Sequence, residues 1–451
     1  MPNTQLPAMD KPKPRKIITY GTFDLLHYGH IRLLERAKAL GDYLIVGVTS
    51  DSFDKQRGKL NVVWNLEKRL NALRQTGLAD EILVEEYFGQ KVDDILRLRP
   101  DVFVVGSDWR GHFDYLKDFC DVQYLERTKD ISSTHLRNTN LLLHLGILAQ
   151  NPRLLRRILL ESHFVSGLNP RAIYSTHALH DLCHDFGIES YPTIDSMLAS
   201  CDAFFVDCLH GSFVPQLLEL GKHVLYENPL CYSAKELENL FAMARANNCV
   251  LLEANKTAYS PLFLRLLAML KSNIIGRIYN VQACLTMLLP KQAWSISSSF
   301  LRFGSAPMMA IAKILGTQYQ RLHFESFFEH GNDFFTQAIF RYENAIATAT
   351  CGTGVKQEGN LVIAGERGYV LVASPWWKAS EFEICFEDRN QNQRIFLRFE
   401  GEGLRYELAE FAELIRDHKE SYKLTMKDSC FIAHIFERFR DYCNTKETNN
   451  A

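Results

Sequence analysis

Apolar residues follow two alternating spacings in the first part of the chain. Short runs such as KIITYGTF (16–23), DYLIVGVTSD (42–51) and PDVFVVGSD (100–108) are rich in β-branched and aromatic residues, which is typical of buried strands. Between the first two, DLLHYGHIRLLERAKALG (24–41) has apolar residues at helical spacing and ends at a glycine. Strand and helix alternate up to about residue 138, which predicts an α/β unit with a largely parallel sheet.

The pattern repeats and then changes along the rest of the chain. A second alternation runs from LLLHLGILA to CVLLEAN, and from about Gly276 short strands such as AIATATCG and GYVLVAS follow one another across tight turns. Two helical segments close the chain. We therefore predict an α/β protein with a flexible tail (1–15), a Rossmann-like domain (16–138), a second Rossmann-like domain (141–256) and a mostly antiparallel α+β domain (257–445).

Composition excludes several classes of protein. The 451 residues contain 51 Lys and Arg against 53 Asp and Glu, a net charge of −2, which argues against nucleic-acid binding through a broad basic face. No apolar run reaches the roughly 20 residues of a membrane span, and the first residues lack the apolar core of a secretory signal. The 11 cysteines occur without any CxxC pair, as expected for reduced thiols in a cytoplasmic protein.

Two histidines bracket a glycine where the first predicted helix begins. His27, Gly29 and His30 lie in GTFDLLHYGH, directly after a strand. The N-terminus of a helix attracts anions, and imidazoles there can donate to phosphate oxygens. Gly29 permits close approach of a ligand to the backbone, and Asp24 could cap the helix or orient a histidine.

A second motif, RTKDISSTHLR, has the same chemistry. Arg127 follows a strand and can clamp a phosphate bidentately, and the hydroxyls of Ser132, Ser133 and Thr134 can cap a helix or bond to phosphate. Each motif alone is also explained by an ordinary helix cap. Both motifs in one α/β domain predict a site for a nucleoside triphosphate.

GTFDLLHYGH together with RTKDISST resembles the HxGH nucleotidylyltransferases, and among them the glycerol-3-phosphate cytidylyltransferases. The resemblance covers nearly all of residues 16–138. It implies that an oxygen of glycerol 3-phosphate attacks the α-phosphate of CTP, giving CDP-glycerol and pyrophosphate with the help of Mg²⁺. No metal site built by protein side chains is expected. The expected partners are CTP and glycerol 3-phosphate.

The resemblance also implies roles for individual residues. His27 and His30 would stabilise the transition state, with Lys59 neutralising the phosphates and Arg127 holding the base or phosphates. The nucleotide-binding residues would be Thr22, Phe23, Asp24, Gly29, Thr128, Ile131, Ser132, Ser133 and Thr134. The acceptor side would be formed by Arg57, Arg69, Asp108 and Trp109. The family signature RTxGISTT reads RTKDISST here, with Asp130 for glycine, so the acceptor stays open between glycerol 3-phosphate, ribitol 5-phosphate and phosphoethanolamine.

The later segments AFFVDCLHGSFVPQLLELGKHVLYENPL and CVLLEANKTAYSP resemble the Gfo/Idh/MocA oxidoreductases. Three signatures of that family are altered. AQNPRL replaces the glycine-rich loop that approaches a pyrophosphate, Asn228 replaces the EKP lysine, and the DxGxH pattern reads Arg302-Phe303-Gly304-Ser305-Ala306. His210 falls where the family often has a histidine on the cofactor side, although an ordinary histidine explains it as well.

The intact histidine motif and the altered oxidoreductase signatures together leave three hypotheses for the function of the chain. The first is a cytidylyltransferase for a bacterial surface polymer with a degenerate oxidoreductase region, for which NAD(P) is not expected. The second is a bifunctional enzyme in which the C-terminal half is an NAD(P)-dependent reductase that supplies the alditol phosphate. The third is a binding or scaffold protein without activity, which the intact histidine motif disfavours. Self-association into a homo-oligomer is expected from the relatives of both halves.

Overall fold

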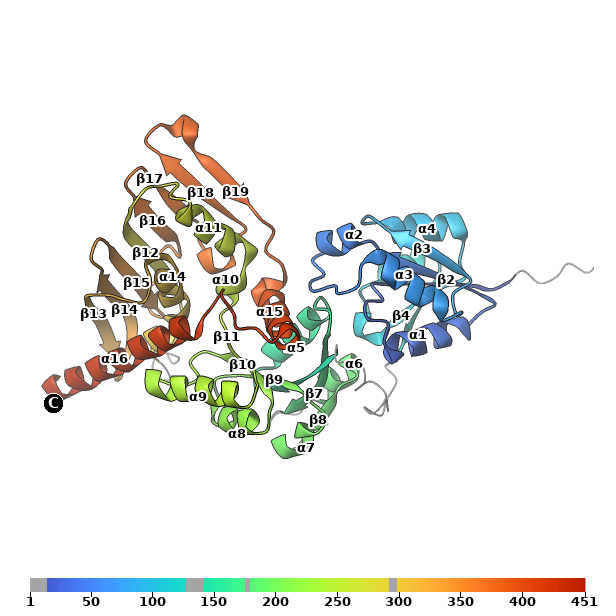
Figure 1. Cartoon of the computed structure of the whole chain (residues 1–451), viewed down its shortest axis with the longest axis horizontal. Coiled ribbons are helices and arrows are strands. Elements are labelled where there is room, and N and C mark those ends of the chain that lie inside the picture. Colours follow the sequence, from blue (N-terminus) through green and yellow to red (C-terminus); the bar gives the residue numbers. More distant parts are fainter. Residues whose placement is uncertain (1–13, 127–141, 175–178, 292–297, 451) are drawn as a thin grey trace, which may run out of the picture. The chain divides into compact units, whose positions relative to one another are not determined.

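The computed structural model describes residues 14–126, 142–174, 179–291 and 298–450 (Figure 1). Two compact units divide the chain. The first contains the residues before Leu143 together with Phe164–Gly167 and Leu179–Ser190, and the second contains the remainder. The domain boundaries that we expect from the sequence stay predictions.

The first unit contains a five-stranded parallel sheet in the order β3-β2-β1-β4-β5. Its strands are β1 (Lys16–Gly21), β2 (Tyr43–Thr49), β3 (Glu81–Glu85), β4 (Val102–Gly106) and β5 (Asp121–Leu125). The strands alternate with helices, as the apolar pattern predicts. Ile17 and Val46 pack on one face of the sheet and Ile18 and Phe103 on the other, so both faces are buried.

The helices of the first unit differ from the sequence prediction at their ends. They are α1 (Tyr28–Lys38), α2 (Asp51–Gln56), α3 (Leu66–Gln75) and α4 (Gln90–Leu98), with short 3₁₀ turns η1 (Ser107–Trp109) and η2 (Asp114–Asp118). The first helix begins four residues later than the spacing predicts. Phe23 and Leu25 have φ angles of 51° and 55°, which an α-helix does not accept, so the segment before His27 is a turn.

A second parallel sheet has the order β11-β10-β9-β6-β7-β8. Its strands are β6 (Leu143–Leu148), β7 (Leu168–Tyr174), β8 (Glu189–Tyr191), β9 (Ala203–Val206), β10 (His223–Glu227) and β11 (Leu251–Ala254). The helices that alternate with these strands are α5 (Pro152–Ser162), α7 (Ile194–Leu198), α8 (Val214–Glu219) and α9 (Ala234–Ala246), whereas α6 (His180–Phe186), between β7 and β8 in the sequence, falls in the first unit. This alternation confirms the predicted Rossmann-like region.

The third sheet has eight strands in the order β13-β14-β15-β12-β16-β17-β18-β19. The strands are β12 (Ile278–Thr286), β13 (Arg321–Glu329), β14 (Asn332–Arg341), β15 (Ile346–Gly352), β16 (Leu361–Gly365), β17 (Gly368–Val372), β18 (Glu381–Phe386) and β19 (Gln393–Phe396). All pairs are antiparallel except β12 with β15, so the prediction of a mostly antiparallel sheet is confirmed.

Helices cover one face of the third sheet, where α11 and α14 lie side by side (Figure 1). The helices of this region are α10 (Lys256–Tyr259), α11 (Pro261–Lys271), α13 (Ser299–Phe303), α14 (Ser305–Leu315), α15 (Leu404–Asp417) and α16 (Met426–Asn450). None of the helices within the described ranges is long and apolar enough to cross a membrane.

Candidate functional site

The candidate triphosphate site lies at the carboxyl ends of β1 and β4. These two strands are neighbours, and the chain leaves them in opposite directions along the sheet, because β2 lies beyond β1 and β5 beyond β4. Ligands of open α/β sheets bind at such a switch point. The turn that leads to His27 follows β1, and η1 with Asp108 and Trp109 follows β4.

The two histidine rings are stacked at the start of α1. Their centroids are 3.8 Å apart, and the ring of Phe23 contacts His30 edge-on at 5.4 Å. Burial lowers the pKa of His30, and the charges of His27 and Lys59 lower it further. The buried Nδ1 of His30 has no hydrogen-bond partner among the described residues. In a neutral imidazole only the nitrogen that carries the proton can donate, so His30 can offer one hydrogen bond at the helix N-terminus.

Gly29 leaves room for the ring of His27. A Cβ atom built at this position lies 3.0 Å from both Cε1 and Nδ1 of His27, which is a tight contact that the ring would have to relieve by a small shift. His27 is the N-cap of α1 and makes no side-chain capping hydrogen bond. The glycine thus keeps the first imidazole in its stacked position, in addition to the close ligand approach expected from the sequence.

Asp24 does not cap α1. Its carboxylate instead accepts hydrogen bonds from the backbone N–H groups of Val63 and Trp64, both at 2.8 Å. The side chain is buried, with 7% exposed. It thereby anchors the loop 58–65 at Val63 and Trp64, and Lys59, in the same loop, contributes a positive charge that lowers the pKa of His30.

Arg57 lies at the edge of the same group of residues. Its Nη2 atom donates to the hydroxyl of Thr22 at 2.6 Å and to Asp54 at 2.7 Å, and its side chain stays 22% exposed. Thr22 directly follows β1. The guanidinium is held by Thr22 and Asp54 and stays partly exposed, and its place on the acceptor side stays a prediction.

Arg69 has a different role from the expected one. Its side chain is completely buried and donates to the backbone oxygens of Thr22 and Thr49 at 2.8 Å and to that of Trp64 at 3.0 Å. Asp51 accepts a further bond at 2.5 Å. All of these partners are internal, so the structure places Arg69 beneath the site, where it holds three segments together and does not face a substrate.

The remaining expected residues divide into two groups. Asp108 and Trp109 are half-buried in η1, and the indole ring lies 6.0 Å from the ring of Phe113. The second motif lies wholly outside the described residues, so the structure does not test it. The expected site residues in that motif are Arg127, Thr128, Ile131, Ser132, Ser133 and Thr134.

Protein side chains offer little to a metal ion here. Within the part of the chain that the structure describes, no group of three His, Cys, Asp or Glu residues could hold a metal. Magnesium bound with a nucleotide takes most of its ligands from phosphates and water. A Mg²⁺ ion that entered with a nucleotide would therefore be held mainly by the phosphates and water.

At the carboxyl end of β6 in the second sheet, backbone N–H groups are already hydrogen-bonded to side chains of the protein. Asn151 Oδ1 accepts from the N–H groups of Arg153 and Leu154, at 3.0 and 3.4 Å, and Pro152 has no N–H group. The N–H group of Gln150 donates to the buried carboxylate of Asp207 at 3.0 Å. The amides that bind a pyrophosphate in dinucleotide sites are thus already engaged, and this loop does not fit that ligand.

Other altered positions are also engaged internally. The peptide bond before Pro229 is cis, and the Asn228 amide donates to Glu253 at 2.6 Å. Glu253 is buried, which raises its pKa, and Ser305 donates to the same oxygen at 3.3 Å. His210 is buried and pairs with Asp207 at 2.6 Å. Asn228, Glu253 and Ser305 thus form one hydrogen-bonded group, and His210 and Asp207 form a separate buried pair.

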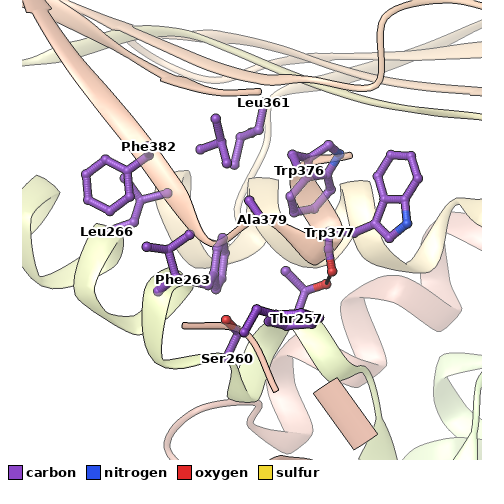
Figure 2. A pocket seen from close by; sticks show the side chains of 12 residues that line it. Thr257, Ser260, Phe263, Leu266, Leu361, Trp376, Trp377, Ala379 and Phe382 are labelled. Atoms are coloured by element: carbon purple, nitrogen blue, oxygen red, sulfur yellow. Dashed lines mark hydrogen bonds between the residues drawn. The ribbon is translucent and has the colours of Figure 1, made fainter. Parts of the chain in front are cut away.

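Figure 2 shows an apolar pocket of the second unit that lies between α11 and the third sheet. Trp376, Phe263 and Phe382 line it, and Thr257 Oγ1 donates to the backbone oxygen of Trp377 at 3.3 Å. Its volume of about 10 Å³ accommodates about one water molecule. The pocket is a packing gap and is too small for a substrate.

Two protein families match separate parts of the chain. Residues 18–139 match the cytidylyltransferase-like family, and residues 156–255 match the oxidoreductase family with an NAD-binding Rossmann fold. Over 123 residues, 27% of this chain, it is 50% identical to the glycerol-3-phosphate cytidylyltransferase of Bacillus spizizenii, of which it covers 95%. The corresponding Staphylococcus aureus protein is 47% identical and covered to 92%. The chain belongs to the cytidylyltransferase-like family, as a nucleotidyltransferase joined to a Gfo/Idh/MocA-type oxidoreductase region.

Solved structures resemble the second part of the chain. One is a 3-ketoreductase from Actinomadura kijaniata, in complex with NADP and TDP-benzene, with a TM-score of 0.59 at 21% sequence identity. The superposition includes 66% of this chain and 97% of the ketoreductase. An aldose-aldose oxidoreductase from Caulobacter crescentus reaches a TM-score of 0.60 at 14% identity, over 68% of this chain and 98% of its own. At these identities the likeness shows the fold alone. The match of residues 156–255 to an NAD-binding family argues against our expectation that NAD(P) is not a cofactor, whereas the capped loop after β6 does not fit a dinucleotide.

Proposed function

We propose that the first unit transfers CMP from CTP to glycerol 3-phosphate, giving CDP-glycerol and pyrophosphate. A phosphate oxygen of the acceptor attacks the α-phosphate in line, the bond to the β-phosphate breaks, and pyrophosphate leaves. No covalent intermediate with the protein is needed, so positioning and charge stabilisation supply the catalysis.

The stacked pair of His27 and His30 is the observation that carries this proposal. The position of the pair at the N-terminus of α1, where backbone N–H groups attract anions, supports a phosphate contact there. Lys59 adds a positive charge beside the pair. In this proposal Arg57, Asp108 and Trp109 face the acceptor, and the residues from Arg127 to Thr134 bind the nucleotide.

A matrix of nucleotides and acceptors tests this function. Pyrophosphate release from the full chain is measured with CTP, ATP, GTP and UTP, each with glycerol 3-phosphate, ribitol 5-phosphate or phosphoethanolamine and Mg²⁺. We expect release with CTP and glycerol 3-phosphate well above every other pair. Preference for another alditol phosphate would correct the acceptor alone, and no release with any acceptor would refute the transfer.

The second candidate function is that the C-terminal region is an NAD(P)-dependent reductase that supplies the alditol phosphate. The match of residues 156–255 to an NAD-binding oxidoreductase family favours it. A dinucleotide would have to compete with Asn151 and Asp207 for the amides after β6. Calorimetry with NADH and NADPH tests this candidate, and the absence of binding by either would exclude it.

Further expectations stay part of this proposal. We infer that Mg²⁺ accompanies CTP, that the protein acts in the cytoplasm as a homo-oligomer, and that CDP-glycerol serves a bacterial surface polymer. The names of the curated relatives support the product. Light scattering of the purified chain gives the oligomeric state directly.

A further inference from the structure

A short segment from beyond the cytidylyltransferase-like region belongs to the first unit. It is Phe164–Gly167, which lies between α5 and β7 in the sequence and is grouped with the N-terminal part of the chain. The segment falls within residues 156–255, which match the oxidoreductase family, and outside residues 18–139. Val165 and Ser166 are buried. The first unit therefore contains a packed segment that the cytidylyltransferase-like match does not include.

This segment is hydrogen-bonded to the loop that carries Lys59. The N–H group of Leu60 donates to the backbone oxygen of Phe164 at 2.7 Å, and the N–H group of Ser166 donates to the backbone oxygen of Leu60 at 3.0 Å. Leu60 and Val165 thus form a parallel β-bridge. Both backbone polar groups of the residue that directly follows Lys59 are consequently held by this segment.

Lys59 is also held on its other side. Its own N–H group donates to the backbone oxygen of Asp54 at 2.8 Å, and Gly58 before it has a φ angle of 77°, so the chain turns there. Without the bonds after Lys59 the loop would have more conformations, and ordering them again for catalysis would cost entropy. The charge of Lys59 lowers the pKa of His30, so the position of this loop bears on the histidine pair.

The same segment contacts the expected acceptor side. The ring of Phe164 lies edge-on to the indole ring of Trp109, with their centroids 6.0 Å apart. Trp109 ends η1, and α6, which also belongs to the first unit, packs beside η1. Aromatic contacts of this kind restrict the orientation of an indole ring. One segment therefore contacts both the lysine loop and a residue expected beside the acceptor.

We propose that the segment 164–167 positions Lys59 and Trp109 for the transfer, so that residues of the oxidoreductase-like region complete the cytidylyltransferase site. This inference rests on the proposed CMP transfer. Phe164 and Ser166 are positioning residues, because they act through the loop and the indole ring and not on the substrates. The altered oxidoreductase signatures do not affect this role, since a backbone bridge needs none of their side chains.

Proline at position 166 tests the bridge, because proline has no N–H group. In the full chain, Ser166→Pro is expected to lower kcat for pyrophosphate release from CTP and glycerol 3-phosphate by about twofold to tenfold, of the order of one lost backbone hydrogen bond. Ser166→Ala is the matched control, because it keeps the N–H group and should have wild-type constants. When Lys59→Met is also present, Ser166→Pro should lower kcat no further if the bridge acts through the lysine.

Replacing Phe164 tests the contact with Trp109. Phe164→Ala is expected to raise KM for glycerol 3-phosphate by about twofold to tenfold with KM for CTP unchanged, of the order of one lost aromatic pair. Phe164→Tyr keeps the ring and should restore the wild-type value. Phe213→Ala is the control, because it removes similar ring contacts, with Tyr174 and His210, in the second unit.

Melting temperatures show which variants fold, and Phe164→Ala decides if Ser166→Pro does not fold. Wild-type constants in the folded variants, or an equal fall of kcat by Ser166→Pro with and without Lys59→Met, would overturn the positioning by this segment and leave the transfer intact. A wild-type chain that is inactive with every acceptor would overturn the proposed transfer and this inference with it.

Discussion

Replacing Asp24 with alanine removes both acceptors that hold the N–H groups of Val63 and Trp64. Hydrogen bonds to a charged group contribute about 1.5–3 kcal/mol each, so even at the low end two bonds give about 3 kcal/mol. If this energy positions Lys59 in the transition state, kcat/KM falls by about a hundredfold, since about 1.4 kcal/mol corresponds to a factor of ten. The Asp24→Asn variant keeps one accepting oxygen, and we expect a fall of about tenfold.

The assay is pyrophosphate release with CTP and glycerol 3-phosphate, together with the melting temperature of each variant. Asp101→Ala is the matched control, because Asp101 also accepts a backbone N–H bond, from Lys16 at 2.7 Å, but at the amino end of β1. The control should retain wild-type kinetics. Wild-type activity of Asp24→Ala, or equal losses in Asp24→Ala and Asp101→Ala, would refute the coupling between Asp24 and Lys59.

Three further changes have predicted outcomes. Arg69→Met removes the buried guanidinium that bonds three backbone oxygens and pairs with Asp51 and Asp54, and it should destabilise the first unit by about 3 kcal/mol or more, measured as a lower melting temperature. Burial raises the pKa of Glu407 from 4.5 to about 8, so the folded chain retains a proton that the unfolded chain releases, and stability falls as pH rises from about 4.5 to 8. Glu407→Gln should therefore raise the melting temperature at pH 8 more than at pH 5, and an equal change at both would contradict this. Asn151→Gly frees two amides of α5 and should tighten NADPH binding in calorimetry, whereas unchanged binding would show that the cap does not limit it.

The sequence predicted the two parallel sheets because their strands are buried on both faces and read as continuous apolar runs. It did not predict β13, where Arg321, His323 and Glu325 face outward and the exposed Phe327 breaks the alternation. It also extended the first helix back to Asp24, since apolar spacing does not reveal the positive φ angles of Phe23 and Leu25.

The candidate site was predictable to the extent that its chemistry is local. His27, Gly29 and His30 lie within the short segment 27–30, so their proximity in space follows from the motif. The roles of Arg69 and Asp24 depend on segments about 40 residues apart, as in the bond from Arg69 to Thr22, and an arginine is rarely buried this completely.

Formation of CDP-glycerol by the wild-type chain and by His30→Ala tests the proposed transfer most directly. The product is identified by mass after incubation with CTP, glycerol 3-phosphate and Mg²⁺. The proposed role of the imidazole predicts CDP-glycerol from the wild type and at least a hundredfold slower formation by the variant, of the order of one lost transition-state contact. Equal rates for the two proteins, or no CDP-glycerol from the wild type, would contradict it.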